Sequence, residues 1–409
     1  MTGNYRTMPG INLYPNILSM SSLRFIFVLF AFTLFSGYTN KSRVSTPVDD
    51  GSVPALTEWS ASLPLDKLKL PAGFSLSVYA EVEDARSMAI SPSGTLFVGN
   101  KDSDKVYALK DTDGDFKADK KWVLAKGLNM PNGVAFKGGD LYIAEVNRIL
   151  KIQGVESKLS NPGEPVVVYD KYPKDGHHGW KYIAFGPDGK LYVPVGAPCN
   201  ICEPKSPYAS ITRINPDGSG MEIFASGVRN SVGFTWKPDT NEMWFTDNGR
   251  DMMGDDVPPC ELNLAPKAGM HFGYPYCHGG TIKDPDFGDR KPCSDFTKPA
   301  QNLGPHVAPL GLKFYTANMF PAPYRGNLFI AEHGSWNRSK GAGHTGHRLV
   351  FLKVDNNQVK SYEPFITGWL EQDKWTSWGR PVDVLVLADG SMLISDDKAG
   401  VIYRVTYKG

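Results

Sequence analysis

The chain has almost no excess of charge and no long run of like charge. Its 409 residues include 44 Lys and Arg against 43 Asp and Glu. A nucleic-acid-binding protein presents a basic face to the phosphates, so this balance gives no reason to expect a nucleic-acid partner. Amphipathic helical patterns of about 10 to 15 residues between the strand-like segments are also missing, which argues against a doubly wound α/β fold.

The apolar run near the N-terminus is short. Residues 25–35 (FIFVLFAFTLF) follow Arg24 and are succeeded by polar sequence. A membrane-spanning helix takes roughly 20 residues, whereas a run of this length suits the apolar region of a signal peptide. We therefore predict that residues 1–37 are a signal peptide or N-terminal export segment. The mature protein is then periplasmic or secreted and has no membrane span; a buried segment of the fold is the alternative.

Cysteine is scarce, and the further Cys or His ligands that a zinc or haem site needs are missing around it. All five cysteines lie in one region, at Cys199, Cys202, Cys260, Cys277 and Cys293. No His follows the CxxC of residues 199–202, and no second CxxC completes a zinc site. In an exported chain this pattern predicts local disulfides with one thiol left over. Cys277 and Cys293 flank a Gly/Asp/Pro-rich loop and are the favoured pair, although the connectivity stays open.

Glycine and proline are abundant, and a repeat accompanies them. The 42 Gly and 31 Pro favour a turn-rich β architecture. Hairpins such as SPSGTLFVGN, FKGGDLYIAE and GPDGKLYVPVG recur six times; the copies align on Leu96, Leu141, Leu191, Met243, Leu328 and Met392. A unit of about 40 to 50 residues with several antiparallel strands is typical of a propeller blade. We predict an all-β, six-bladed β-propeller, with a β-sandwich containing incidental hairpins as the alternative.

The repeat also divides the chain. We assign residues 38–70 to a lead-in segment and residues 71–409 to the propeller, with an insertion around 250–305 where two copies lie far apart. The apolar segment 74–82 (FSLSVYAEV) precedes the first copy and could supply a strand that closes the ring.

Polar side chains stand just before or at the first strand of almost every copy. They are Arg86, Asn132, His177, His178, Arg229, Asn230, His306 and Arg380. The innermost strands of a propeller line its central channel, so these residues are expected to converge on one pocket. Since Arg binds carboxylates through two parallel hydrogen bonds, the set predicts a pocket for a polyanionic ligand.

His178 is the candidate general base of this pocket. A neutral imidazole is the commonest group for taking a hydroxyl proton, although a single His is more often structural. Metal binding by His177 and His178 together is disfavoured, because neighbouring strand residues point to opposite faces.

Two segments carry calcium-type ligands. The stretch DTDGDFKAD spaces Asp111, Asp113, Asp115 and Asp119 around a glycine. Position twelve of this loop is Trp122 rather than Glu, so it is not a complete EF-hand, and a solvated acidic turn is the alternative. The second segment, residues 246–256 (TDNGRDMMGDD), could hold Ca²⁺ beside the pocket through carbonyls and carboxylates.

Several passages resemble the soluble PQQ-dependent sugar dehydrogenases, particularly their sorbosone dehydrogenase-like branch. They are GHHGWKYIAFGPDGKLYVPVGAPCN, SGVRNSVGF, TDNGRD with CELN, FGYPYCHGG, HVAPLGLKFY, AEHGSWNRS and GRPVDV. They extend from about residue 70 to the C-terminus. The resemblance implies a six-bladed propeller with pyrroloquinoline quinone (PQQ) and Ca²⁺ on the axis. It also implies oxidation of a small sugar or sugar-derived alcohol or aldehyde, with electrons passed to an external acceptor.

The resemblance implies roles for particular residues. His178 aligns with the catalytic base, and Arg229 with Asn230 would contact the quinone oxygens, where Arg229 stabilises developing negative charge. The carbonyls of Gly249 and Arg250 would bind the calcium. Arg380 matches an arginine that grips the cofactor carboxylates, as Arg86 and Asn132 of the ring would also do.

The chain departs from the family pattern at three places. The second arginine of the late R-x-R-D pattern is Val382, and no lysine matches the family's late cofactor lysine. His333, Arg338 or Lys340 could replace that lysine. Residues 181–182 are Lys-Tyr where the glucose enzymes have Gly-Arg, so glucose specificity is not transferred. A calcium-dependent lactonase and a non-enzymatic binding propeller are the other interpretations.

Overall fold

The computed structural model describes residues 51–52 and 57–409, so the predicted export segment 1–37 and much of the predicted lead-in lie outside it. The described part of the lead-in forms a short helix, α1 (Glu58–Ala61), and a 3-10 turn, η1 (Leu65–Lys67). Within the described residues, no helix is long and apolar enough to cross a membrane.

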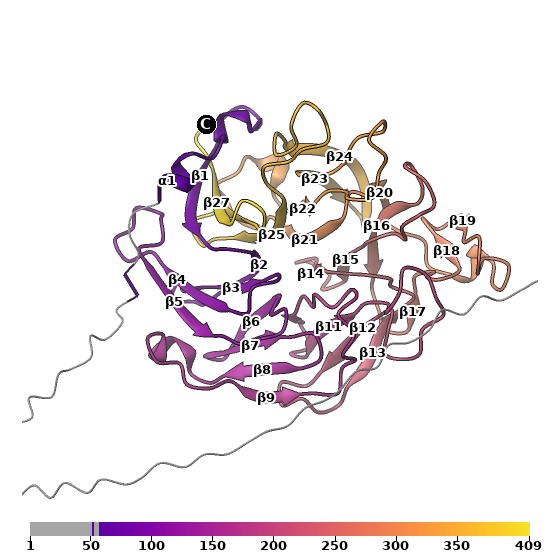
Figure 1. The fold of residues 1–409 in the computed structure, drawn as a ribbon, viewed down its shortest axis with the longest axis horizontal. Helices are drawn as coiled ribbons and strands as arrows, with labels where there is room; N and C mark the ends of the chain where they lie inside the picture. The colour runs from indigo at the N-terminus through magenta and orange to yellow at the C-terminus, as the bar shows by residue number, and fades with distance from the viewer. Residues whose placement is uncertain (1–50, 53–56) are drawn as a thin grey trace, which may run out of the picture. The chain divides into compact units, whose positions relative to one another are not determined.

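Six antiparallel sheets stand around a common centre, so the predicted all-β, six-bladed propeller is confirmed (Figure 1). Each blade has four strands; the innermost is the first in chain order in five blades, whereas in the sixth it is β25 and the N-terminal β1 lies outermost. The first three blades are β2 (Ala85–Ile90), β3 (Leu96–Asn100), β4 (Val106–Lys110), β5 (Lys120–Ala125); β6 (Gly133–Lys137), β7 (Asp140–Ala144), β8 (Ile149–Ile152), β9 (Val166–Tyr169); and β10 (Ala184–Phe185), β11 (Leu191–Val195), β12 (Ser210–Ile214), β13 (Glu222–Ser226).

The remaining three blades complete the ring. They are β14 (Phe234–Trp236), β15 (Met243–Asp247), β16 (Pro259–Ala265), β20 (Gln301–Pro305); β21 (Pro309–Phe314), β22 (Leu328–Glu332), β23 (Arg348–Asp355), β24 (Gln358–Ile366); and β25 (Pro381–Val386), β26 (Met392–Asp396), β27 (Val401–Tyr407), β1 (Phe74–Glu81). Three further 3-10 turns, η2 (Val155–Lys158), η3 (Cys293–Asp295) and η4 (Ala322–Tyr324), lie in loops.

The ring is closed by strands from opposite ends of the chain. The N-terminal β1 pairs antiparallel with the C-terminal β27, from Phe74 opposite Tyr407 to Glu81 opposite Val401. This confirms the predicted closing strand. The sixth blade therefore forms only when the chain ends meet, which joins the first and last segments of the domain in one sheet.

Two strands of the fourth blade lie inside the segment predicted as an insertion. The sheet order β14-β15-β16-β20 makes β16 and β20 ordinary blade strands, so the added chain runs from residue 266 to 300. It contains β17 (Met270–His271), β18 (Cys277–His278) and β19 (Ile282–Lys283). Strand β17 pairs parallel with β13 and so ties the addition to the third blade.

The core lies between neighbouring blades, where apolar side chains of facing sheets pack together. Near the centre the strands approach closely: a Cβ added at Gly133 would lie 2.3 Å from the carbonyl oxygen of Lys181 on the next blade. A glycine is needed there, since any side chain would push the two blades apart.

The structure contains two disulfides, Cys199–Cys202 and Cys277–Cys293. The favoured pair from the sequence is thus confirmed. Cys260 is the remaining thiol, and it is buried.

Phe74 anchors the closing strand, and its removal tests the closure. Its ring packs edge-on against Phe320, Tyr324 and Phe365, with centroids 4.8 to 5.2 Å away. We expect Phe74→Ala to lower the free energy of unfolding by about 3 kcal/mol, because a large aromatic side chain leaves a cavity. Urea unfolding measures this, with the exposed Val167→Ala on β9 as control. A loss equal to that of the control would contradict the anchoring role.

Candidate active site

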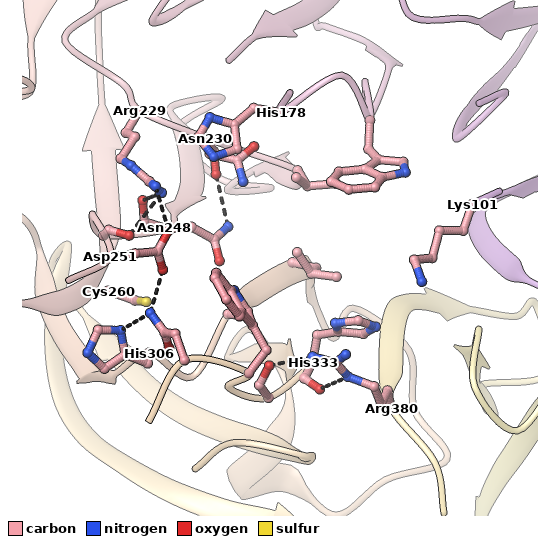
Figure 2. Close-up of a pocket in the computed structure, with 18 of the residues that line it drawn as sticks. Lys101, His178, Arg229, Asn230, Asn248, Asp251, Cys260, His306, His333 and Arg380 are labelled. Carbon is pink, nitrogen blue, oxygen red and sulfur yellow. Dashed lines mark hydrogen bonds and ion pairs between the residues drawn. The ribbon is translucent and has the colours of Figure 1, made fainter. Parts of the chain in front are cut away.

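A cavity of about 360 Å³ opens at the centre of the propeller. Most of the ring residues predicted from the sequence line it: Arg86, His177, His178, Arg229, Asn230, His306 and Arg380, together with Gly249 and His333. Figure 2 shows Arg229, Asn248, Asp251 and His306 on one side of the cavity, and Lys101, His333 and Arg380 on the other.

Buried polar residues at the ends of second strands hold the loops that carry these side chains. Asp247 at the end of β15 accepts hydrogen bonds from the backbone N–H groups of Arg229 (2.8 Å) and Asn230 (2.6 Å). Asp396 at the end of β26 likewise accepts from the backbone N–H of Arg380 at 2.8 Å. Burial raises the pKa of Asp247 to about 6 and that of Asp396 to about 7.

The third blade departs from this arrangement and places His178 there instead. Its second strand ends with Val195, and Gly196 follows; a Cβ at Gly196 would lie 2.5 Å from the Cβ of His178. His178 itself has a positive φ of 51°, a conformation that residues other than glycine seldom adopt. The backbone is therefore shaped to bring this imidazole to the cavity wall.

One hydrogen bond sets the tautomer of His178. Its Nδ1 lies 2.8 Å from the carbonyl oxygen of Ala197, which can only accept, so Nδ1 carries the proton. Nε2 is then the basic nitrogen. Burial, followed by the positive charge of Arg229 and the neighbouring His177, lowers the pKa of His178 to about 2 and keeps the ring neutral.

Arg229 uses all five of its N–H donors within the protein. Its Nε and Nη2 donate to the carbonyl oxygen (2.9 Å) and the side-chain oxygen (2.8 Å) of Asn200. Nη1 donates to the carbonyls of Asn248 (3.1 Å) and Gly249 (2.9 Å), and Nη2 also donates to Asp251 (3.0 Å). Since a guanidinium has five donors, none remains in this arrangement for a quinone oxygen, and Arg229 supplies charge to the cavity.

Arg86 is held by a buried network with residues of three other blades. Its Nε donates to Asn132 at 2.8 Å and its Nη1 to Asp397 at 2.9 Å, while His333 Nε2 donates to the other oxygen of Asp397 at 2.8 Å. Burial alone would raise the pKa of Asp397, but His333 and Arg86 outweigh it and lower that pKa. Asn132 does not line the cavity; it positions Arg86 from beneath.

Arg380 has spare donors toward the cavity. Nε donates to the carbonyl of His333 at 3.0 Å and Nη2 to that of Gly334 at 2.5 Å, and among the described residues no carboxylate forms an ion pair with it. Burial lowers its pKa.

The charges around the cavity suit an anion. Arg86, Arg229, Arg380 and Lys101 contribute four positive groups to the lining, against the single carboxylate of Asp251. Arg86, Arg380 and Lys101 keep N–H groups available, and Asn230 has its side chain at the wall. These residues fit a ligand with several carboxylates.

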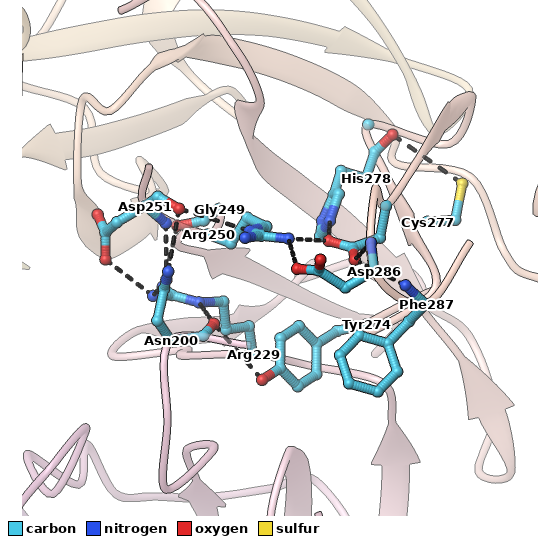
Figure 3. Close-up of polar contacts among 12 residues, drawn as sticks. Asn200, Arg229, Gly249, Arg250, Asp251, Tyr274, Cys277, His278, Asp286 and Phe287 are labelled. Carbon is cyan, nitrogen blue, oxygen red and sulfur yellow. Dashed lines mark hydrogen bonds and ion pairs between the residues drawn. The ribbon is translucent and has the colours of Figure 1, made fainter. Parts of the chain in front are cut away.

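The side chains of Arg338 and Arg250 face elsewhere, although the prediction for Arg250 concerned its backbone carbonyl. Arg338 donates to the carbonyls of Gly343 (2.6 Å) and Asp255, and ties two loops together outside the cavity lining. The Arg250 side chain turns to the added segment, where Nη1 lies 2.5 Å from Asp284 and 3.2 Å from Asp286 (Figure 3). Of the candidate replacements for the cofactor lysine, only His333 lines the cavity.

One of the two calcium ligands predicted beside the cavity, the Gly249 carbonyl, already has a partner. The carbonyl of Gly249 already accepts a hydrogen bond from Arg229, so a cation there would lie against the guanidinium charge. The present arrangement therefore does not fit calcium at this carbonyl.

The acidic loop lies elsewhere, between β4 and β5. The carboxylates of Asp111, Asp113 and Asp115 come within 4.8 Å of one another. Asp119 instead accepts hydrogen bonds from Thr112, so it is not part of this cluster.

The sequence interpretation missed several residues of the lining. Lys101, Trp180, Trp336 and Asn337 face the cavity, and Trp336 is 63% exposed. Trp336 lies in the passage AEHGSWNRS, which carried the family resemblance, so that motif could have identified it. The buried Asp397 directly follows the last residue of a repeat strand, a position that the repeat pattern does not mark as functional.

Comparison with known proteins gives a consistent set of relatives. Residues 144–335 match the family model described as Glucose / Sorbosone dehydrogenase, and residues 282–408 match the model TrAA12-like. An uncharacterized protein of Borreliella burgdorferi is 35% identical over 356 residues, covering 83% of this chain and 91% of that protein. A pyrroloquinoline quinone-dependent pyranose dehydrogenase of Coprinopsis cinerea is 28% identical over 171 residues, 32% of this chain and 22% of that protein.

Solved structures share the fold over most of the chain. A Trichoderma reesei Carbohydrate-Active Enzymes Family AA12 structure has a TM-score of 0.72 at 20% identity, covering 83% of this chain and 98% of its own. The holo pyranose dehydrogenase PQQ domain from Coprinopsis cinerea has a TM-score of 0.69 at 17% identity, covering 83% and 97%. At these identities the likeness concerns the fold.

The neutral state of His178 can be measured directly. Because its pKa is lowered to about 2, the imidazole should keep its Nδ1–H tautomer from pH 8 down to about 4 in the protein without added cofactor. In the unfolded chain this imidazole takes up a proton near pH 6.5, whereas in the folded protein it stays neutral. His178 therefore lowers the free energy of unfolding as the pH falls below about 6.5.

Imidazole ¹⁵N chemical shifts follow this titration, with His178→Gln identifying the signal. A midpoint near 6.5 would contradict the assigned environment.

Proposed function

Because the chain belongs to the glucose/sorbosone dehydrogenase family, we propose that it is a PQQ-dependent oxidoreductase acting on a sugar or sugar-derived alcohol or aldehyde. The observation that carries the proposal is the axial cavity itself. There, a neutral His178 with a basic Nε2 stands among three arginines and a lysine. Bound PQQ would accept the hydride that leaves the substrate carbon.

His178 supplies the base of the proposed reaction. The Ala197 carbonyl fixes the proton on Nδ1, so Nε2 can take the hydroxyl proton of the substrate as its C–H bond breaks. Burial, assisted by the nearby charge of Arg229, keeps the imidazole unprotonated before the reaction. The same charge favours negative charge developing on the substrate oxygen.

The cationic residues would hold the cofactor. Arg86, whose side chain is fixed by Asp397, and Arg380, whose backbone N–H is fixed by Asp396, are the candidates for its carboxylates. Asn230 adds a side-chain amide. Trp180 and Trp336 place indole rings at the wall, which suits a planar ligand or the apolar face of a sugar. A calcium-dependent lactonase would need several carboxylate ligands at the centre, whereas the charged groups of this lining are four cations and the single carboxylate of Asp251.

We also infer that the protein is exported, to the periplasm or outside the cell. Its two disulfides support this inference, since disulfides persist in oxidising compartments. The physiological electron acceptor is external to the chain.

Reconstitution tests the activity. The purified protein is incubated with PQQ, and dye reduction is followed with a panel of aldoses and sugar aldehydes. We expect His178→Ala to lower kcat by about 10² to 10⁴-fold while PQQ still binds, because only the proton acceptor is lost. His177→Ala is the matched control and should retain most of the activity. Absence of both PQQ binding and turnover in the wild-type protein would rule the proposal out.

Calcium dependence is a separate question. The sequence predicts Ca²⁺ at Gly249 and Arg250, whereas the Gly249 carbonyl is held by Arg229. We therefore expect protein treated with EDTA to bind PQQ with an affinity that added CaCl₂ changes little, as measured by tryptophan fluorescence quenching. MgCl₂ is the control salt. A dependence on Ca²⁺ alone would support the sequence-based prediction instead.

A further inference from the structure

Asn200 lies at the centre of the contacts that fix Arg229. Its side-chain oxygen accepts hydrogen bonds from Arg229 Nη2 (2.8 Å) and from the backbone N–H of Asp251 (2.8 Å), and its Nδ2 donates to the Asp251 carbonyl (3.0 Å). Its own carbonyl accepts from Arg229 Nε at 2.9 Å. One residue of the third blade thus binds both an arginine of the cavity and the loop that follows β15 (Figure 3).

A disulfide encloses Asn200. Cys199 and Cys202 flank it in a loop of only three residue steps. Tyr274 of the added segment secures the same loop, since its hydroxyl accepts the backbone N–H of Cys202 at 3.1 Å and lies 3.4 Å from Cys199 Sγ. The loop is therefore anchored on two sides before its asparagine meets Arg229.

The size of this loop indicates what the disulfide does. The stabilisation from closing a loop grows with loop length, so a bridge across three residue steps restricts the unfolded chain far less than the Cys277–Cys293 bridge across sixteen. Its main physical effect is local: it limits the conformations available to Asn200.

Further contacts extend along the same wall of the cavity to His306. Asp251 accepts a hydrogen bond from Asn337, whose side chain also lies 3.1 Å from His306 Nδ1. Arg229 in turn holds the carbonyls of Asn248 and Gly249. Displacement of Asn200 would thus loosen Arg229, the loop after β15 and a contact of His306 together.

We propose that Asn200, held by the Cys199–Cys202 disulfide, is a positioning residue that sets the place of Arg229 and Asp251 in the cavity. It acts through these two residues, and its side chain is directed at them. The positioning role does not depend on the proposed dehydrogenase activity. Only the PQQ-binding measurement below rests on that proposed function.

Three variants separate the parts of this arrangement. Asn200→Ala removes the three side-chain hydrogen bonds. Asn200→Asp keeps the oxygen that accepts from Arg229 and from the Asp251 N–H. The double variant Cys199→Ser/Cys202→Ser leaves Asn200 in place and removes its restraint. Asn215→Ala, an asparagine bonded to Ser219 in the turn after β12, is the matched control.

Crystal structures, the thermal midpoint and PQQ titration are measured for each variant. We expect Asn200→Ala and the double serine variant to show the Arg229 guanidinium displaced from the carbonyls of Asn248 and Gly249. Both should bind PQQ roughly tenfold or more weakly, because the positive charge that Arg229 supplies to the cavity is displaced. Their thermal midpoints should fall only a few degrees below that of Asn215→Ala. Asn200→Asp should restore the wild-type position of Arg229.

Each result decides one point. An unmoved guanidinium in both Asn200→Ala and the double serine variant would overturn the positioning role. So would a failure of Asn200→Asp to restore it when the alanine variant displaces it. If Arg229 moves as expected but the wild-type protein binds no PQQ, the positioning stands and the proposed function fails.

Discussion

Buried carboxylates beneath the cavity are the interaction on which the rest of the site depends. Asp247 holds the backbone of Arg229 and Asn230, Asp396 holds the backbone of Arg380, and Asp397 pairs with Arg86. Four cations at one centre would repel each other and pay a large desolvation cost if nothing opposed them. These three aspartates offset part of that repulsion and fix the arginines, yet none of them lines the cavity. The open face of the cavity therefore remains positive.

The same arrangement distinguishes the third blade. In blades one, two, four and six, a buried polar residue stands at the end of the second strand or directly after it. It hydrogen-bonds to the loop that leads into the first strand of the same blade. These residues are Asn100, Glu145, Asp247 and Asp396. The third blade has Val195 and Gly196 there, and the space is filled by His178. A carboxylate at this place would raise the pKa of the imidazole and favour its protonated form. Its replacement by a small residue leaves a neutral base, which is the state that proton abstraction requires.

The fold was predictable because its repeat is local. Each copy has a turn, an alternating strand and a paired neighbour, so six copies implied six blades, and the segment before the first copy formed the closing strand. The convergence of Arg86, His178, Arg229 and Arg380 followed from the geometry of inner strands. Side-chain directions within long loops have no such periodicity. That is why Arg338 was placed at the site although it binds Gly343 elsewhere. The partners of Arg229 were equally hidden, since Asn200 and Asp251 lie 29 and 22 positions away from it in the chain.

The central claim is that the cationic cavity holds PQQ with His178 as its neighbouring base. A crystal structure of the protein soaked with PQQ tests this most directly. The account predicts the cofactor in the axial cavity, with its carboxylates contacting Arg86 and Arg380, and with His178 Nδ1 still bonded to the Ala197 carbonyl. PQQ bound outside this cavity, or a His178 ring turned so that Nε2 meets that carbonyl, would contradict it.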